Sequence, residues 1–276
     1  AVKVVSRGGG QVTPDGWSVN TSQPAYQPSG IAPAPGATLT LANPLGKDGN
    51  LPLPPQRAIT PGDTLTAKGV GWAWYAGGWN AALDDGRQPP EAVRKVIYAG
   101  GEASPMFQPH HQPFNYFARF APGTADRNRH LLDGAQLLSD AAAGTLPAVS
   151  FYKPAGRYTQ HPSYTDVLSG DAHMAAVLEA LRQSPQWQDM LVVVTYDENG
   201  GYWDHVAPPT GPGWGDRFGP GTRVPTLLIG PHVKRGFVDH TPYDTTSILK
   251  FITQRWNLEP LPGVRAKVGN LGAALQ

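Results

Sequence analysis

Two adjacent carboxylates after a short apolar stretch are the first feature of this sequence that suggests chemistry. Residues 191–194 are apolar and mostly β-branched, which predicts a buried strand. Asp197 and Glu198 follow this strand, and the pair Gly200-Gly201 turns the chain. Ligands of open α/β sheets collect beyond the carboxyl ends of strands, and neighbouring carboxylates there repel each other unless a cation lies between them. The segment therefore indicates a metal-dependent hydrolytic site.

The same residues also allow a structural role. Asp-Glu-Asn-Gly is favourable turn chemistry, so Asp197 and Glu198 also suit the cap of a turn or a helix. Asp204 and His205 add a third acid and an imidazole within the same loop. His205 either faces the site, where it would bind substrate, or holds the loop by hydrogen-bonding a carbonyl group. We favour the second role for His205 and keep the first as a candidate.

The string DENGG, followed by DHV and a proline pair, resembles the bacterial phosphoesterase family. This family contains secreted acid phosphatases and phospholipases C of the alkaline-phosphatase-like superfamily. Further segments resemble the family in the same order along most of the chain: residues 16–30, 60–80, 109–120, 161–174 and 224–252. The wording HHQPFNYFARF and QHPSYTDV is closest to the acid-phosphatase branch.

The resemblance implies a fold, a site and a mechanism. The fold would be an alkaline-phosphatase-like three-layer α/β/α sandwich with a mostly parallel central sheet. Asp197 and Glu198 match the family's metal ligands, and His110, His111 and His161 match histidines that line its phosphate pocket. The family mechanism implies attack by a metal-activated hydroxyl, giving a phospho-enzyme that water hydrolyses. Oxygen ligands favour Ca²⁺, Mg²⁺ or Mn²⁺, and charged histidine donors imply an acidic optimum.

Taken without the resemblance, the histidines are ambiguous. His110 and His111 lie between Pro109 and Pro113, which predicts an extended segment whose neighbouring side chains point opposite ways. His161 precedes a proline and would alone be an ordinary loop residue. The remaining candidates are interpreted as structural: His130, His173, His232 and His240.

Part of the family's pattern is not present in this sequence. The family also uses a Glu-Asn pair in a motif resembling ENRSFD or ENHTFD, and a Ser or Thr nucleophile, and no such motif occurs here. We therefore expect residues 1–276 to be the C-terminal portion of a single catalytic domain whose partner is a missing N-terminal portion. If the chain acts alone, the nucleophile must be sought within it, first at Ser150, Thr159 and Ser169.

Three functions follow as hypotheses. The main one is an acid phosphatase that acts on small phosphomonoesters. The first alternative is a phospholipase C acting on phosphodiesters, for which the aromatic residues of 72–79 and 203–214 would supply an apolar approach. The second alternative is a non-catalytic binding or accessory domain of the same fold.

Composition narrows the partners and the compartment. A formal charge of +1 with 16% charged residues offers no basic surface for nucleic acid. The absence of cysteine excludes disulfides and thiolate metal sites. No apolar run approaches the ~18 residues of a membrane span. A periplasmic or extracellular location is implied by the resemblance alone.

Helices and strands are expected to alternate, which predicts an α/β core over residues 61–276 with a parallel sheet covered on both faces. Residues 1–60 are rich in glycine and proline and are expected to be loops, with Trp17, Tyr26 and Leu51 as possible anchors. Helices are predicted at 60–69, 130–143, 171–183 and 242–256, and strands at 71–75, 147–152, 191–196 and 226–229. Asp171 and Asp244 are interpreted as helix-cap or loop residues.

Overall fold

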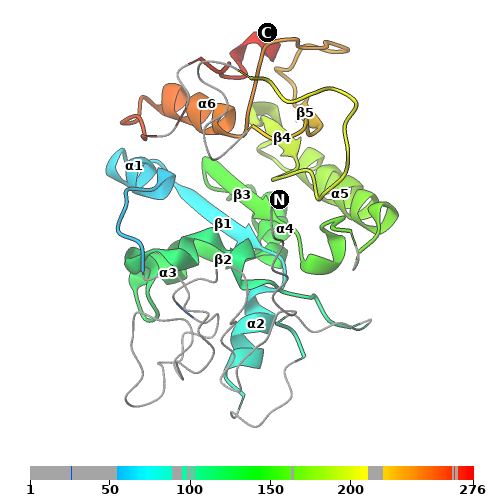
Figure 1. Ribbon diagram of the computed structural model, residues 1–276. Coiled ribbons are helices and arrows are strands. Elements are labelled where there is room, and N and C mark those ends of the chain that lie inside the picture. Colours follow the sequence, from blue (N-terminus) through cyan, green and yellow to red (C-terminus); the bar gives the residue numbers. More distant parts are fainter. Residues whose placement is uncertain are drawn as a thin grey trace, which may run out of the picture. The chain divides into compact units, whose positions relative to one another are not determined.

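A computed structural model describes residues 26, 55–88, 95–97, 101, 103–162, 165–210, 220–262, 264 and 267–276 of the 276-residue chain. Helices and strands are mixed along it, which agrees with the α/β class (Figure 1). The chain forms two compact units. The first comprises residues 1–58, 73–140 and 149–176, and the second comprises residues 59–72, 141–148 and 177–276.

The first unit is built on a three-stranded sheet. Strands β1 (Trp72–Ala76), β2 (Leu131–Asp133) and β3 (Val149–Lys153) lie in the order β2-β1-β3. β1 and β2 are parallel, with Trp74 opposite Leu131. The helices and short 3-10 turns of this part are α2 (Trp79–Gly86), η1 (Pro109–His111), η2 (Pro113–Tyr116), η3 (Ala118–Phe120), α3 (Ala125–His130), α4 (Gly134–Ala143) and η4 (Gly156–Tyr158).

Side chains of β1 alternate between the two faces of the sheet. Trp74 stacks on Phe151 of β3, with ring centroids 5.5 Å apart, and meets Phe114 of η2 edge-on at 6.0 Å. Tyr75 points the other way, and its hydroxyl donates a hydrogen bond to Asp140 of α4 at 2.7 Å. One face therefore carries the 3-10 turns around η1, and the other carries α4.

The predicted helix over residues 130–143 is wrong in its first part. Residues 131–133 form β2, and α4 starts at Gly134. One tertiary and one local interaction account for this: Leu131 pairs with Trp74 of β1, and the Asp133 carboxylate accepts the amide of Ala135, two residues on, at 2.8 Å. The buried apolar side chains of α4 are Leu137 and Ala141, whereas Leu138 and Ala142 are exposed. Gly144 follows α4 with a φ of 70°, as its predicted role as C-cap requires.

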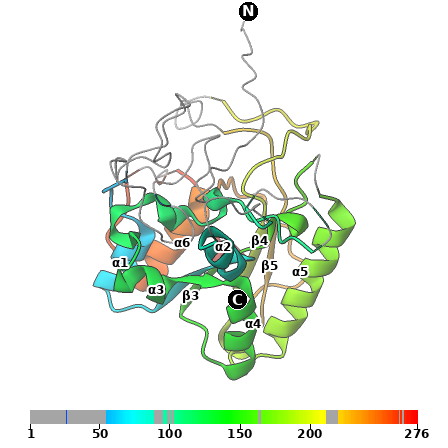
Figure 2. The same ribbon diagram turned by 90° about the horizontal axis from the view of Figure 1, so that it is seen from below.

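Helix α5 (Val167–Arg182) starts before the predicted residue 171. Asp166, not Asp171, caps it: its carboxylate accepts the Ser169 amide at 2.7 Å and the Ser169 hydroxyl at 2.8 Å. The cap prediction for Asp171 is therefore wrong. Helices α4 and α5 lie side by side (Figure 2), and Gly144 at the end of α4 lies against Pro185, just past α5.

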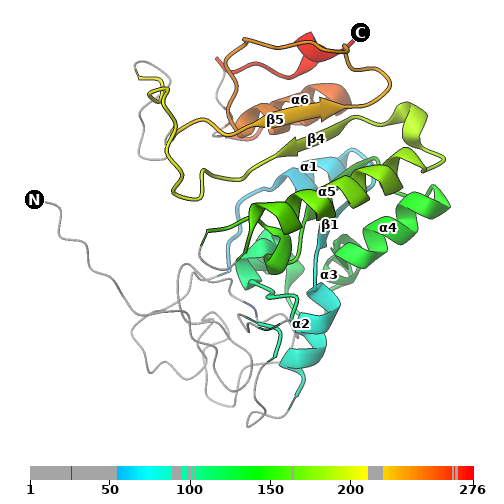
Figure 3. The same ribbon diagram turned by 90° about the vertical axis from the view of Figure 1, so that its right-hand side faces the viewer.

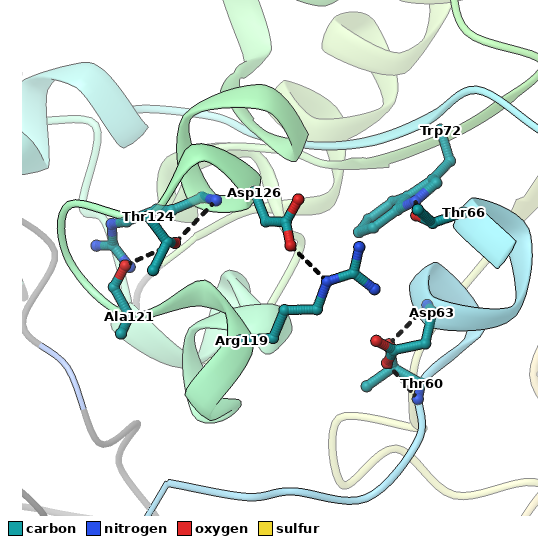
Figure 4. Close-up of polar contacts among 9 residues, drawn as sticks. Thr60, Asp63, Thr66, Trp72, Arg119, Ala121, Thr124 and Asp126 are labelled. Carbon is teal, nitrogen blue, oxygen red and sulfur yellow. Dashed lines mark hydrogen bonds and ion pairs between the residues drawn. The ribbon is translucent and has the colours of Figure 1, made fainter. Parts of the chain in front are cut away.

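The second unit begins with helix α1 (Pro61–Ala67), as predicted. Thr60 and Asp63 form a capping box, in which the Thr60 amide donates to Asp63 at 2.8 Å and the Asp63 amide to Thr60 at 3.2 Å (Figure 4). The indole N–H of Trp72 donates to Thr66 at 2.9 Å, which ties the start of β1 to the helix. Helix α6 (Thr246–Trp256) starts later than the predicted residue 242, and its N-cap is Thr245. Asp244 precedes the helix, in agreement with its interpretation as a loop or cap residue, and its carboxylate accepts the Thr246 amide at 2.8 Å.

Strands β4 (Val192–Thr195) and β5 (Thr226–Ile229) lie side by side in the second unit (Figure 3). They are antiparallel, with Thr195 opposite Thr226. Every residue of β4 is only half-buried, and Leu227 of β5 is 59% exposed. The prediction of a buried strand in a parallel sheet is therefore wrong here. Parallel strands need a long crossover, usually helical, and the described residues between β4 and β5 contain no helix. The short turns of this unit are η5 (Trp187–Asp189) and η6 (Gly272–Ala274).

Tyr26, in the loop-rich N-terminal segment, is hydrogen-bonded to the rest of the first unit. Its carbonyl accepts the Asn115 side chain at 2.6 Å, and Arg127 donates to the same asparagine at 2.6 Å. The anchoring role of Tyr26 is thus confirmed, whereas Trp17 and Leu51 lie outside the described residues. In the described part of the chain, no helix has the length and apolar character needed to cross a membrane.

Candidate active site

His110 and His111 lie in the 3-10 turn η1, not in an extended segment. The His111 amide donates to Gln108 at 2.8 Å and the Gln112 amide to Pro109 at 3.2 Å, so the backbone supplies the bend that the flanking prolines did not predict. The two rings consequently meet edge to face with centroids 4.7 Å apart. His110 is exposed and His111 is buried. The turn is fixed to β1, because Trp74 donates its indole N–H to the His111 carbonyl at 2.9 Å.

The environment of His111 keeps its imidazole neutral. Burial, together with the charges of Lys153, His110 and His161, lowers the pKa of His111 to about 2. A neutral imidazole can donate one N–H and accept at its other nitrogen. The expectation that all three pocket histidines act as cations therefore does not extend to His111. The electrostatic interactions also show that Lys153 and His161 belong to the surroundings of this ring.

His161 is exposed and follows η4 by a short turn. Its Nδ1 lies 2.7 Å from the carbonyl oxygen of Pro162. A carbonyl oxygen only accepts, so Nδ1 carries the proton of this hydrogen bond. This fixed tautomer suits a group that exchanges a proton at Nε2.

The turn after β1 brings strand ends together. Gly77 donates its amide to the Lys153 carbonyl at 2.9 Å, and a Cβ on Gly77 would stand 2.2 Å from the Ala155 amide nitrogen, so a side chain cannot fit there. Gly78 has a φ of 81°, which favours glycine. Asp133 at the end of β2 accepts the Asn80 amide of α2 at 2.8 Å. Sequence reasoning missed Lys153 here, although its place at the end of a strand was an available signal.

Tyr152 lies on the face of β3 opposite Phe151, and together with Tyr158 of η4 it contacts His173 of α5. The Tyr152 hydroxyl lies 2.7 Å from His173 Nε2, and the Tyr158 ring stacks on the imidazole at 4.4 Å between centroids and 6° between planes. Burial raises the pKa of Tyr152 to about 12 and lowers the pKa of His173. These contacts fasten α5 to the sheet, which agrees with the structural interpretation of His173.

In the second unit, Asp197 and Glu198 follow β4 and are both exposed. Glu198 accepts the Gly200 amide at 2.5 Å, and Asn199 accepts the Gly201 amide at 2.7 Å. Gly200 and Gly201 have φ values of 63° and 83°. The turn role of this segment is therefore confirmed for Glu198, and it does not oppose a metal role, because a carboxylate has lone pairs for several partners.

Three side-chain contacts fasten this loop to the segment before β5. Thr195 and Thr226 hydroxyls lie 2.8 Å apart, and Asn199 donates to Thr222 at 2.7 Å. Arg223 grips Asp204 with two hydrogen bonds of 2.9 and 3.1 Å, which hold the pKa of Asp204 at about 2.

The ion pair with Arg223 defines the surroundings of Asp204, the third acid of this loop. Asp204 already has a counter-ion, which sequence reasoning missed because Arg223 lies beyond the loop. His205 Nδ1 stands 3.6 Å from Asp204 Oδ1, and the His205 side chain is 76% exposed. Its role in binding substrate stays a prediction.

The acidic pair fits a cation only as part of a larger shell. Asp197 and Glu198 offer the oxygen atoms that Ca²⁺, Mg²⁺ and Mn²⁺ prefer, but Ca²⁺ takes about 6–8 oxygen ligands. Over the described ranges, no three His, Asp or Glu side chains gather in a way that could hold a metal. The proposed nucleophiles also have local roles: Thr159 donates to Gly156 at 2.9 Å, and Ser169 belongs to the cap of α5.

Comparison with known proteins decides the family. The model of the phosphoesterase family matches residues 17–259. The chain belongs to the phosphoesterase family. It is 36% identical over 162 residues to the non-specific phospholipase C6 of Arabidopsis thaliana, covering 48% of this chain and 30% of that protein. It is 35% identical over 227 residues to a non-hemolytic phospholipase C of Burkholderia pseudomallei, covering 71% and 31%.

A non-hemolytic phospholipase C of Pseudomonas aeruginosa is 32% identical over 169 residues, covering 50% of this phosphoesterase chain and 24% of that protein. The matches thus span 24 to 31% of the length of these three relatives. Their names support the phospholipase C alternative better than the acid-phosphatase hypothesis.

The predicted apolar approach is present only in part in this phosphoesterase. Trp72 and Trp79 are each only 2% exposed, so the first aromatic segment belongs to the core. Tyr202 and Trp203 are 57% and 82% exposed, immediately after the acidic turn. Trp214 lies outside the described residues.

Proposed function

We propose that this chain is the part of a phospholipase C-type phosphodiester hydrolase that carries the phosphate-binding histidines and an acidic metal-ligand pair. The observation that carries the proposal is the histidine turn η1, fixed to strand β1 by Trp74, in a chain that belongs to the phosphoesterase family. A rigid turn that presents two imidazoles suits the recognition of phosphoryl oxygens.

The preference for a phosphodiester rests on two observations. The three named relatives are phospholipases C, of which none is called a phosphatase. Tyr202 and Trp203 are exposed beside Asp197 and Glu198, where they would meet the apolar part of a lipid substrate. The acid-phosphatase hypothesis, based on the wording around His110 and His161, has less support.

Distinct roles follow for the named side chains. Asp197 and Glu198 would hold a divalent cation, which would supply the Lewis-acid chemistry of a metal-dependent hydrolase. His110 would donate hydrogen bonds to phosphoryl oxygens, and the neutral His111 would donate one. His161, with Nδ1 held by Pro162, would exchange a proton at Nε2 with the leaving group.

The coarser architecture of the whole protein is also part of the proposal. An alkaline-phosphatase-like sandwich, a single catalytic domain completed by an N-terminal portion, and a periplasmic or extracellular location are all implied by the resemblance to the family. The small phosphorylated substrate and the exclusion of nucleic acid follow from the residues discussed above.

The test is hydrolysis of a chromogenic phosphocholine diester and a chromogenic phosphomonoester, with Mg²⁺, Ca²⁺ or Mn²⁺, by this chain co-expressed with the N-terminal portion proposed above. We expect the diester to react faster, and His161→Ala to lower that rate ~10²-fold, the range for a lost general acid or oxyanion donor. The matched control is His232→Ala, because His232 is not a proposed phosphate ligand and its Nε2 atom lies 3.0 Å from the Gln188 carbonyl oxygen. A faster monoester reaction would establish the phosphatase instead, and no turnover of either ester would refute the proposal.

A further inference from the structure

We propose that Lys153 binds the phosphoryl group and supplies the permanent positive charge of the site that His110, His111 and His161 line. The ligand class is a phosphate ester or inorganic phosphate. This inference rests on the proposed function and adds a residue to it.

The position of Lys153 follows from the alternation of side chains along β3. Phe151 and Lys153 are two residues apart in a strand, so they lie on the same face. That face is defined by Phe151, which stacks on Trp74 at 5.5 Å, and Trp74 in turn holds the His111 carbonyl. Lys153 is therefore on the side of the sheet that carries the histidine turn.

Tyr152 lies between these two residues and faces the other way, toward His173. The charge of Asp133 raises the pKa of Tyr152, and its carboxylate accepts the amides of Asn80 and Ala135. Asp133 is thus committed to capping α2 and α4. The alternation places the Lys153 side chain on the face opposite Tyr152, which is the face that carries the histidine turn.

The strand end also places Lys153 at the edge where ligands bind in α/β proteins. It is the last residue of β3, and its carbonyl is held by the Gly77 amide at 2.9 Å. Parallel sheets collect ligands beyond the carboxyl ends of their strands. The missing side chain at Gly77 keeps the turn after β1 closely packed on residues 154–155, so the backbone that carries Lys153 is rigid.

A lysine would supply the positive charge that the neutral His111 cannot offer to a phosphate group. His111 is neutral, because burial and neighbouring charges lower its pKa to about 2, and the charge of Lys153 has the largest effect among these neighbours. A neutral imidazole contributes a hydrogen bond to phosphate but no charge. Lys153 is half-buried, and a charge in that setting is screened less than one on the surface. Lysine is also a recurrent phosphate ligand in proteins, as a point charge.

The experiment uses the full chain and four proteins: wild type, Lys153→Met, Lys153→Arg and the matched control Lys68→Met, which removes an exposed lysine after α1. Binding of inorganic phosphate is measured by calorimetry, and kcat and KM are measured with the phosphocholine diester. Lys153→Met should weaken phosphate binding at least tenfold and raise KM. Lys153→Arg should restore most of both, because it restores the charge, and Lys68→Met should match wild type.

A second measurement does not depend on the folding of a variant. Phosphate should slow the acylation of Lys153 in the wild-type chain severalfold, measured by mass spectrometry, and should leave the acylation of Lys68 unchanged. Unchanged phosphate affinity in Lys153→Met, no phosphate binding by wild type, or equal acylation with and without phosphate would each overturn the inference. If phosphate binding depends on Lys153 but no ester is hydrolysed, the inference about Lys153 holds and the proposed function is refuted. If hydrolysis is the same in wild type and Lys153→Met, the proposed function holds and the inference about Lys153 is refuted.

Discussion

Replacing His111 by glutamine should make the first unit more resistant to acid. In the folded chain the pKa of His111 is lowered to about 2 by burial, whereas an unfolded histidine titrates near ~6.5. Between these values the unfolded state binds a proton that the folded state does not. Stability is therefore lost as the pH falls through 6.5, by ~1.4 kcal/mol per pH unit. From pH 7.5 to pH 4.5 this amounts to ~2.7 kcal/mol. Glutamine cannot titrate, so His111→Gln should lack this loss, although it should be less stable near pH 7.5 through imperfect packing.

The assay must report on the unit that contains His111, since a chain of two units can unfold in more than one step. The indole N–H signal of Trp74, which donates to the His111 carbonyl at 2.9 Å, is such a probe. Urea titrations followed by this NMR signal at pH 7.5, 6.0 and 4.5 give the free energy of unfolding. The control Phe114→Leu disturbs the same core without removing an ionisable group, so it should lower stability and keep the wild-type pH dependence. If His111→Gln and wild type lose the same free energy of unfolding on acidification, the inference that His111 is buried in its neutral form is wrong.

Two further predictions address the acidic turn and the glycine turn. Asp197→Asn and Glu198→Gln should each weaken Mn²⁺ binding more than ~10-fold, because a charge is lost at constant volume; calorimetry measures this, Asp189→Asn is the control, and wild-type affinity in both variants would contradict the ligand role. Gly77→Ala should destabilise the chain by ~1–3 kcal/mol, because its Cβ would stand 2.2 Å from the Ala155 nitrogen. Gly71→Ala, where the new Cβ meets only Pro147 at 3.8 Å, should change stability by less than ~0.5 kcal/mol, and equal melting temperatures for the two variants would refute the packing argument.

Features with a local cause were predictable from the sequence. The start of α1 depends on Thr60 and Asp63, which cap one helix end between them. The end of β1 depends on Gly77 and Gly78, and the turn after β4 on Gly200 and Gly201. In each case the residues that decide the structure lie within a few positions of it, so composition and spacing carry the signal.

Features decided by distant contacts were not predictable. Residues 131–133 read as the first turn of a helix, and only the pairing of Leu131 with Trp74 makes them a strand. The antiparallel direction of β4 and β5 depends on a connection that no periodicity describes. Within the site, the neutral state of His111 depends on its burial, and the counter-ion of Asp204 is Arg223, which lies 19 residues away in the sequence. Residue types identified the candidates, but their charge states required the fold.

These charge states bear on the choice between the two esters. A phosphomonoester carries about 1.5 to 2 negative charges at neutral pH, whereas a phosphodiester carries about one. Lys153 brings one permanent positive charge to the histidine cluster, and His111 brings none. In the second unit, Arg223 is engaged by Asp204 and adds no net charge to the acidic turn. The preference for the diester therefore rests on the names of the relatives, which are phospholipases C.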